Sequence, residues 1–213
     1  MPDDPPVTRL MLITPELGEI DAFEASFEGA LAAGDVAAVV IRLAPADDRT
    51  RLARAKTLVE AAQAEGAAAL LAGDGVEDIV GKSGADGLHV ADLAAALDAI
   101  ERFKPEKIVG CGPLASRDDA MAAGEAGVDY VLFGEDVGGR PFDATLERVA
   151  WWTPIFETPC VGFAQELDQV AALAGENAEF ALLGEAVWRH QSGPAVAVAE
   201  AGSMLSLAKA PTP

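Results

Sequence analysis

The sequence predicts a single α/β domain folded as a (β/α)₈ barrel. Eight short apolar runs alternate with helical segments along the 213-residue chain. The runs are continuously apolar, as expected for parallel strands that are covered on both faces. No shift in composition marks a second domain, and eight repeated units suit a closed barrel. A doubly wound open sheet is the alternative, because hydrophobic periodicity does not report closure.

Four strand–helix units are predicted in the first half of the chain. The strands are the apolar runs 9–14, 38–43, 68–71 and 87–90, and the helices that follow them are 21–33, 47–65, 76–83 and 92–103. The first helix gathers its phenylalanines on one face. Asp47 or Asp48 caps the second helix, and Gly66 ends it. Asp92 caps the fourth helix, and Pro105 stops it.

The second half of the chain repeats this alternation of strands and helices and completes the barrel. The strands are 107–111, 130–134, 160–164 and 180–184, and the helices are 116–126, 144–152, 166–174 and 193–208. Ser116 caps the first of these helices. We therefore expect a barrel over residues 9–209, a disordered tail over 1–8 and a loose tail over 210–213.

Composition and charge narrow the classes of function. The 35 acidic residues outnumber the 15 basic residues and give a net charge of −20, which disfavours nucleic-acid binding. No apolar run approaches the roughly 18 residues of a membrane helix. The acidic, proline-rich start does not resemble a signal peptide, so we expect a cytoplasmic protein. A small-molecule ligand is the expected partner, and a homodimer stays open.

Functional groups in a barrel lie where the strands end and in the loops just after them. The candidates at these positions are Thr14, Glu16, Arg42, Asp74, Asp78, His89, Asp92, Cys111, Glu135, Asp136, Gln165, Glu166, Gly184 and Glu185. Carboxylates dominate this set, and Arg42 is its clearest cation. We expect Arg42 either to clamp a phosphate or to form a salt bridge with Asp74 or Glu16.

Each of the other chemical groups also has a structural interpretation. His89 lies inside a strand, where a histidine is more often a hydrogen-bonded core residue than an acid or base. Cys111 is more often a buried inert thiol than a nucleophile. Asp74, Asp78 and Asp92 supply oxygen ligands of the kind that Mg²⁺ prefers, although Asp92 also serves as a helix cap.

Several segments, taken in order, resemble the superfamily of thiamine phosphate synthases and TenI-type thiazole tautomerases. Residues 84–90, which read Gly-Ala-Asp-Gly-Leu-His-Val, are the most specific match. The segments 9–15, 38–43, 109–110 and 126–134 resemble other strands of the family, so the likeness spans about residues 9–190. It implies a barrel independently of the periodicity.

The resemblance implies a reaction and a set of ligands. The synthases couple hydroxymethylpyrimidine diphosphate to a thiazole phosphate with Mg²⁺ and release pyrophosphate, whereas the tautomerases move protons on a related thiazole. The matching positions that we expect to contact substrate are Arg42, His89, Gly110, Cys111, Gly134 and Gly184. Asp74 and Asp92 are the expected metal ligands.

The chain departs from the family pattern where phosphate should bind. Ala44 stands at the position of a strand lysine, and Leu114 stands at that of the tautomerase histidine. The Thr-x-Thr-Lys loop is replaced by residues 135–140, which begin with Glu135 and end with Arg140. Ala164 and Gln165 replace a Gly-Gly phosphate turn.

These departures predict a depleted phosphate site and slow or absent coupling. At least two of Glu135, Asp136 and Glu185 are expected to lie close together and to repel an anion. Whether the chain is a catalyst therefore stays open. The alternatives are a non-catalytic binding or regulatory paralogue on the same barrel, and a different barrel enzyme that uses the acidic mouth.

Overall fold

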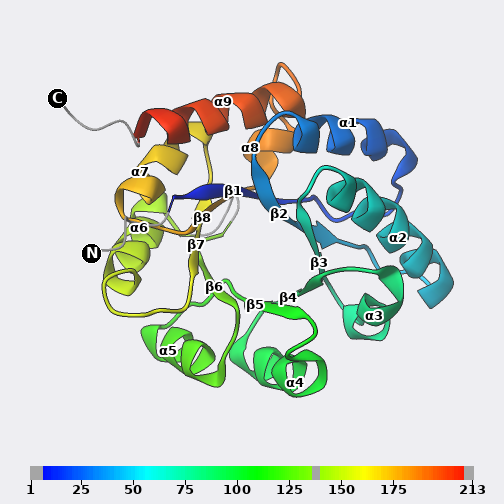
Figure 1. Cartoon of the computed structure of the whole chain (residues 1–213), viewed down its shortest axis with the longest axis horizontal. Helices are drawn as coiled ribbons and strands as arrows, with labels where there is room; N and C mark the ends of the chain where they lie inside the picture. Colours follow the sequence, from blue (N-terminus) through cyan, green and yellow to red (C-terminus); the bar gives the residue numbers. More distant parts are fainter. Residues whose placement is uncertain (1–6, 136–139, 209–213) are drawn as a thin grey trace.

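A closed barrel of eight parallel strands forms the centre of the molecule (Figure 1). The computed structural model describes residues 7–135 and 140–208. The strands pair in chain order, and β8 closes the barrel on β1, with Arg9 opposite Phe180 and Leu12 opposite Leu183. The predicted (β/α)₈ barrel is confirmed, and the open sheet is wrong.

The strands agree closely with the predicted runs. They are β1 (Arg9–Ile13), β2 (Val36–Arg42), β3 (Ala68–Ala72), β4 (Gly87–Val90), β5 (Ile108–Cys111), β6 (Tyr130–Phe133), β7 (Cys160–Ala164) and β8 (Phe180–Leu183). The tail expected over residues 1–8 lies largely outside the described residues. Thr8, which is described, is buried, and its hydroxyl donates a hydrogen bond to the carbonyl of Ala178 at 2.7 Å.

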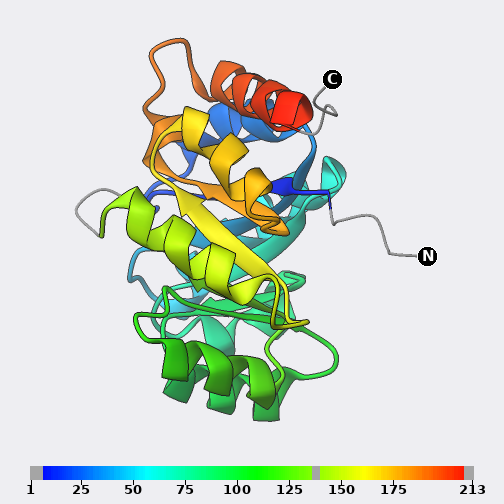
Figure 2. The same cartoon turned by 90° about the vertical axis from the view of Figure 1, so that its left-hand side faces the viewer.

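Helices surround the barrel, and Figure 2 shows α6 and α7 covering the strands behind them. The helical elements are α1 (Asp21–Ala32), α2 (Asp48–Ala64), η1 (Val76–Asp78), α3 (Val80–Ser83), α4 (Leu93–Phe103), α5 (Arg117–Ala126), α6 (Phe142–Trp152), η2 (Leu167–Gln169), α7 (Val170–Gly175), α8 (Glu185–Trp188) and α9 (Pro194–Ala208). Within the described residues, none of these helices is both long and apolar enough to span a bilayer.

Side-chain hydrogen bonds fix where several helices begin. Asp47 accepts from the backbone N–H of Thr50 at 3.0 Å, so Asp47 caps α2 and Asp48 does not. Asp92 caps α4 by accepting from Ala95 at 2.9 Å. Ser116 caps α5 in the same way.

Two apolar layers result from the alternation of side chains along each strand. Residues that point inward fill the barrel, including Met11, Val40, Tyr130, Leu132, Phe163 and Leu182. Residues that point outward pack beneath the helices in a larger cluster. The inner layer forms the floor of the candidate site.

Candidate functional site

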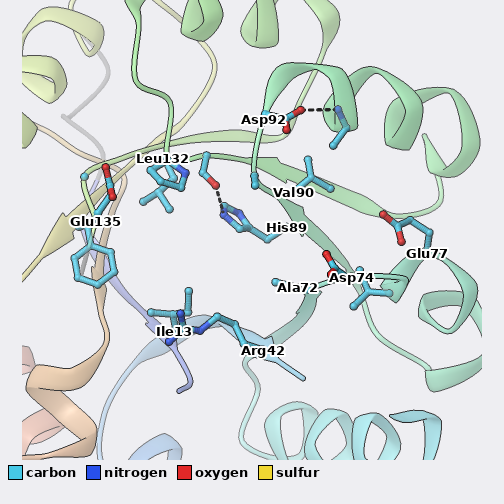
Figure 3. Close-up of a pocket in the computed structure, with 18 of the residues that line it drawn as sticks. Ile13, Arg42, Ala72, Asp74, Glu77, His89, Val90, Asp92, Leu132 and Glu135 are labelled. Atoms are coloured by element: carbon cyan, nitrogen blue, oxygen red, sulfur yellow. Dashed lines mark hydrogen bonds between the residues drawn. The ribbon is translucent and has the colours of Figure 1, made fainter. Parts of the chain in front are cut away.

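A cavity of about 840 Å³ lies where the strands end. Its walls come mainly from the ends of β2, β3 and β4 and from the loops after β3, β5 and β6. The lining residues are Ile13, Arg42, Ala72, Gly73, Asp74, Gly75, Val76, Glu77, His89, Val90, Ala91, Asp92, Ala95, Gly112, Pro113, Leu132, Gly134, Glu135 and Phe163. Figure 3 shows Arg42 and Ile13 on one side of the cavity and Asp92 on the opposite side.

The structure brings together part of the predicted site. The lining includes Arg42, Asp74, His89, Asp92 and Gly134. It does not include Gly110, Cys111 or Gly184.

Arg42 is oriented by the neighbouring strand end. Its Nε donates to the backbone carbonyl of Thr14 at 2.6 Å, and its own backbone N–H donates to the Thr14 hydroxyl at 2.9 Å. None of the ion pairs between described residues involves Arg42, so the expected salt bridge to Asp74 or Glu16 is not among them. The terminal nitrogens are therefore placed to donate to a ligand in the cavity.

His89 is a buried, neutral residue beneath the cavity. Its Nε2 lies 2.9 Å from the carbonyl of Gly112, and its Nδ1 lies 2.9 Å from the Tyr130 hydroxyl. A carbonyl only accepts, so Nε2 carries the proton and Nδ1 accepts from Tyr130. Burial lowers the pKa of His89 to about 4. Both nitrogens are thus used in structural hydrogen bonds, in agreement with the core interpretation.

Gly110 supports this arrangement without touching the cavity. A Cβ at this position would lie 2.0 Å from Cζ of Tyr130, so the tyrosine ring occupies the space over the glycine. The stacked rings of Tyr130 and His89, with centroids 5.7 Å apart, then lie side by side in the barrel. The role visible for Gly110 is to admit Tyr130.

Cys111 points away from the cavity. It is fully buried in the outer apolar layer, among residues such as Leu88 and Val131 that face the helices. Burial raises its pKa to about 12, with smaller contributions from Asp92 and Asp119. A protonated thiol in that layer suits packing and does not suit nucleophilic chemistry.

The carboxylates are distributed around the rim. Figure 3 shows Asp74 and Glu77 on one side of the cavity and Glu135 on the other. In the part of the chain that the structure describes, no three His, Cys, Asp or Glu side chains are grouped as a metal cluster. Glu77, in η1, was not predicted from the sequence, where only its position shortly after β3 could have indicated it.

Glu185 belongs to a different hollow from Glu135. It lines a neighbouring space of about 540 Å³ with Arg189 and His190, and its carboxylate lies 3.0 Å from Arg189. Asp136, the third carboxylate expected at the same place, lies outside the described residues. Of Glu135 and Glu185, only Glu135 lines the main cavity, beside the carboxylates of Asp74, Glu77 and Asp92.

Arg140 and Arg148 line a small space that adjoins the cavity, and they were not predicted as a group. Arg148 on α6 donates to the carbonyls of Leu114 and Ala115, and Arg140 donates to the same Ala115 carbonyl at 3.4 Å. Burial lowers the pKa of Arg148, and the positive charges of Arg140 and Arg117 lower it further. The ion pairs between described residues include none of the three. An anion would relieve this mutual repulsion.

We expect Tyr130→Phe to destabilise the protein by about 1–3 kcal/mol, because it leaves the buried Nδ1 of His89 without a donor. The phenyl ring retains the packing over Gly110, so the decrease in unfolding free energy measures the contribution of the hydrogen bond. Urea unfolding at pH 7.5 measures it. An unfolding free energy equal to that of the wild type would contradict the hydrogen bond between Tyr130 and Nδ1 of His89.

Comparison with known proteins agrees with the barrel fold. The profile of the family described as thiamine monophosphate synthase matches residues 10–186. A thiamine-phosphate synthase of Rhodospirillum centenum is 37% identical over 200 residues, which cover 90% of this chain and 95% of the relative. Another, from Hyphomonas neptunium, is 35% identical over 203 residues and covers 91% of each chain.

Solved structures show the same fold. The thiamine phosphate pyrophosphorylase from Pyrococcus furiosus superposes with a TM-score of 0.79 at 22% identity and covers 94% of this chain and 96% of its own. The family profile and the two full-length relatives decide the assignment. The chain belongs to the thiamine monophosphate synthase family.

Proposed function

We propose that this protein couples hydroxymethylpyrimidine diphosphate to thiazole phosphate and releases pyrophosphate. The observation that carries the proposal is the cavity at the strand ends, which has an apolar floor and is lined by Arg42, whose terminal nitrogens are paired with no described residue. Its relatives, which are named thiamine-phosphate synthases, support the role in thiamine biosynthesis.

The apolar floor and Arg42 would bind different parts of the substrate. Ile13, Leu132 and Phe163 provide an apolar surface that suits the flat pyrimidine ring. Arg42 would donate hydrogen bonds to a phosphate oxygen, and its contact with Thr14 fixes the guanidinium in advance. In the family reaction the carbon–oxygen bond to pyrophosphate breaks with its electron pair, and the thiazole nitrogen then forms the new carbon–nitrogen bond.

The oxygen ligands at the rim suit Mg²⁺. Asp74 and Asp92 would hold the ion together with substrate phosphate oxygens, because Mg²⁺ is commonly bound through one or two carboxylates and phosphates. When bound, Mg²⁺ would neutralise charge on the departing pyrophosphate. Asp92 uses Oδ1 to cap α4, so Oδ2 is the oxygen available to a metal.

The arginines beside the cavity compensate in part for the missing lysine loop. Arg140 and Arg148 line a small adjoining space that shares three lining residues with the main cavity, Pro113, Gly134 and Glu135. We propose that they attract the pyrophosphate end of the substrate. Guanidinium groups match the geometry of phosphate. These two, however, already donate hydrogen bonds to a backbone carbonyl. We therefore expect coupling slower than about 1 s⁻¹.

Arg42→Gln should raise KM for the pyrimidine diphosphate by about tenfold or more, because a charge-assisted hydrogen bond is lost. Chromatography of thiamine phosphate, formed from both precursors with Mg²⁺, measures this. The matched control is Arg102→Gln, since Arg102 is on α4 and pairs with Asp98 at 3.2 Å. An equal KM for Arg42→Gln and the wild type would refute the role of Arg42.

A non-catalytic binding protein is the second candidate, and the absence of the Thr-x-Thr-Lys loop favours it. Calorimetry separates the two functions. Binding of the pyrimidine diphosphate without product, even at long incubation with both precursors, would support the binding protein and reject the synthase. Product that depends on both precursors would support the synthase.

A further inference from the structure

Arg51 is a buried cation directly behind one wall of the cavity. It lies in the first turn of α2, and its side chain is 10% exposed. Nη1 donates to the backbone carbonyl of Asp74, and Nη2 donates to the Asp48 carboxylate at 2.8 Å. Its Nε is buried and has no hydrogen-bond partner among the described residues. A buried donor without a hydrogen-bond partner costs free energy, so the other contacts of this guanidinium must offset that cost.

The loop after β3 has a shape that fits this guanidinium. Gly75 adopts φ +68°, and a Cβ there would lie only 2.9 Å from Nη1 of Arg51. Gly73, two residues earlier, adopts φ +117° and approaches the carbonyl of Leu43. The loop therefore bends at two glycines around Asp74, and Arg51 fills the space that a side chain at Gly75 would need.

The ion pair with Asp48 does not by itself account for Arg51. The Asp48 side chain is 75% exposed, and exposed ion pairs contribute little to stability. The hydrogen bond to the Asp74 carbonyl is the contact that connects Arg51 to the cavity wall. From there the chain continues through Gly75 to Glu77, and the side chains of Asp74 and Glu77 both line the cavity.

We propose that Arg51 is a positioning residue that holds the loop 73–75 so that Asp74 faces the cavity in a geometry suited to a divalent cation. The metal-ligand role of Asp74 rests on the proposed function, whereas the contact between Arg51 and the loop does not. Residues that orient metal ligands commonly change metal affinity by about 10–100-fold when they are removed.

The test is Mn²⁺ binding by the full chain, measured from the electron paramagnetic resonance signal of the free ion, with no substrate present. Arg51→Met keeps most of the side-chain length and removes the donors, so we expect Kd to rise about tenfold. Arg51→Lys, which retains a charge and one donor group, should recover part of the affinity. Arg54→Met is the matched control, because Arg54 is on the same helix and pairs with Glu19 at 3.5 Å.

Hydrogen exchange of the same variants separates positioning from general stability. The amides of Leu43 and Asp78 donate to the carbonyls of Ala72 and Gly75, at the two ends of the loop. Arg51→Met should accelerate exchange of these two amides by at least tenfold while β1 and β7 exchange as in the wild type. Uniform acceleration across the barrel, or unchanged exchange at Leu43 and Asp78, would overturn the proposal. If Arg51→Met does not fold, the same comparison is made with Arg51→Lys.

The outcomes also separate this inference from the coupling reaction. Wild-type protein that binds no Mn²⁺, or Arg51 variants that bind it like the wild type, would overturn the metal-positioning role even if thiamine phosphate is formed. Weaker Mn²⁺ binding by Arg51→Met but not by Arg54→Met supports it even if no product is found.

Discussion

Replacing Gly110 by alanine should lower the unfolding free energy by about 3 kcal/mol. The new methyl group would lie 2.0 Å from Cζ and 2.3 Å from the hydroxyl oxygen of Tyr130. The ring is enclosed by the barrel and cannot withdraw without breaking its hydrogen bond to His89. Overpacking of a core costs about 1–3 kcal/mol, and the lost buried hydrogen bond adds to it. Urea unfolding measures the change.

Gly29→Ala is the matched control. Gly29 lies inside α1 with nothing within 4 Å of the position a Cβ would take. Alanine should therefore stabilise the protein there by about 0.5–1 kcal/mol, since glycine is unfavourable within a helix. If Gly110→Ala were as well tolerated as Gly29→Ala, the Tyr130 ring could not occupy the space described above.

The order of strands and helices could be predicted because local signals decide it. The apolar runs, the aspartate and serine caps and the terminating Pro105 all act within a few residues of one another. The predicted helix over 76–83 divides into η1 and α3, and the one over 166–174 divides into η2 and α7. The four-residue α8 was not predicted, because one turn of helix is too short to show a hydrophobic periodicity.

The site could be predicted only in part, because closure of the barrel decides which side of a strand faces the cavity. Gly110 and Cys111 are neighbours, yet their side-chain positions point to opposite layers. Glu135 and Glu185 both follow strands, yet they line different hollows. Nothing in the sequence indicates a role for Arg51, because its contact with the loop after β3 depends on how α2 packs against the barrel.

Between pH 7 and pH 4, His89 alone should reduce the unfolding free energy by about 3 kcal/mol. Burial lowers its folded pKa from 6.5 to about 4. Between these two pH values the histidine is protonated in the unfolded chain and neutral in the native state. This contribution is fully present above pH 6.5 and is lost as the pH falls toward 4. The magnitude corresponds to the shift in pKa, at about 1.4 kcal/mol per unit.

His89→Gln isolates this contribution from the many carboxylates that titrate in the same range. Glutamine can donate to Gly112 and accept from Tyr130 as the neutral ring does, but it cannot take up a proton. The difference in unfolding free energy between the wild type and His89→Gln, measured by urea at successive pH values, should therefore shift by about 3 kcal/mol in favour of the variant as the pH falls. A constant difference across this range would mean that His89 is protonated in the native state, with Nδ1 donating to Tyr130.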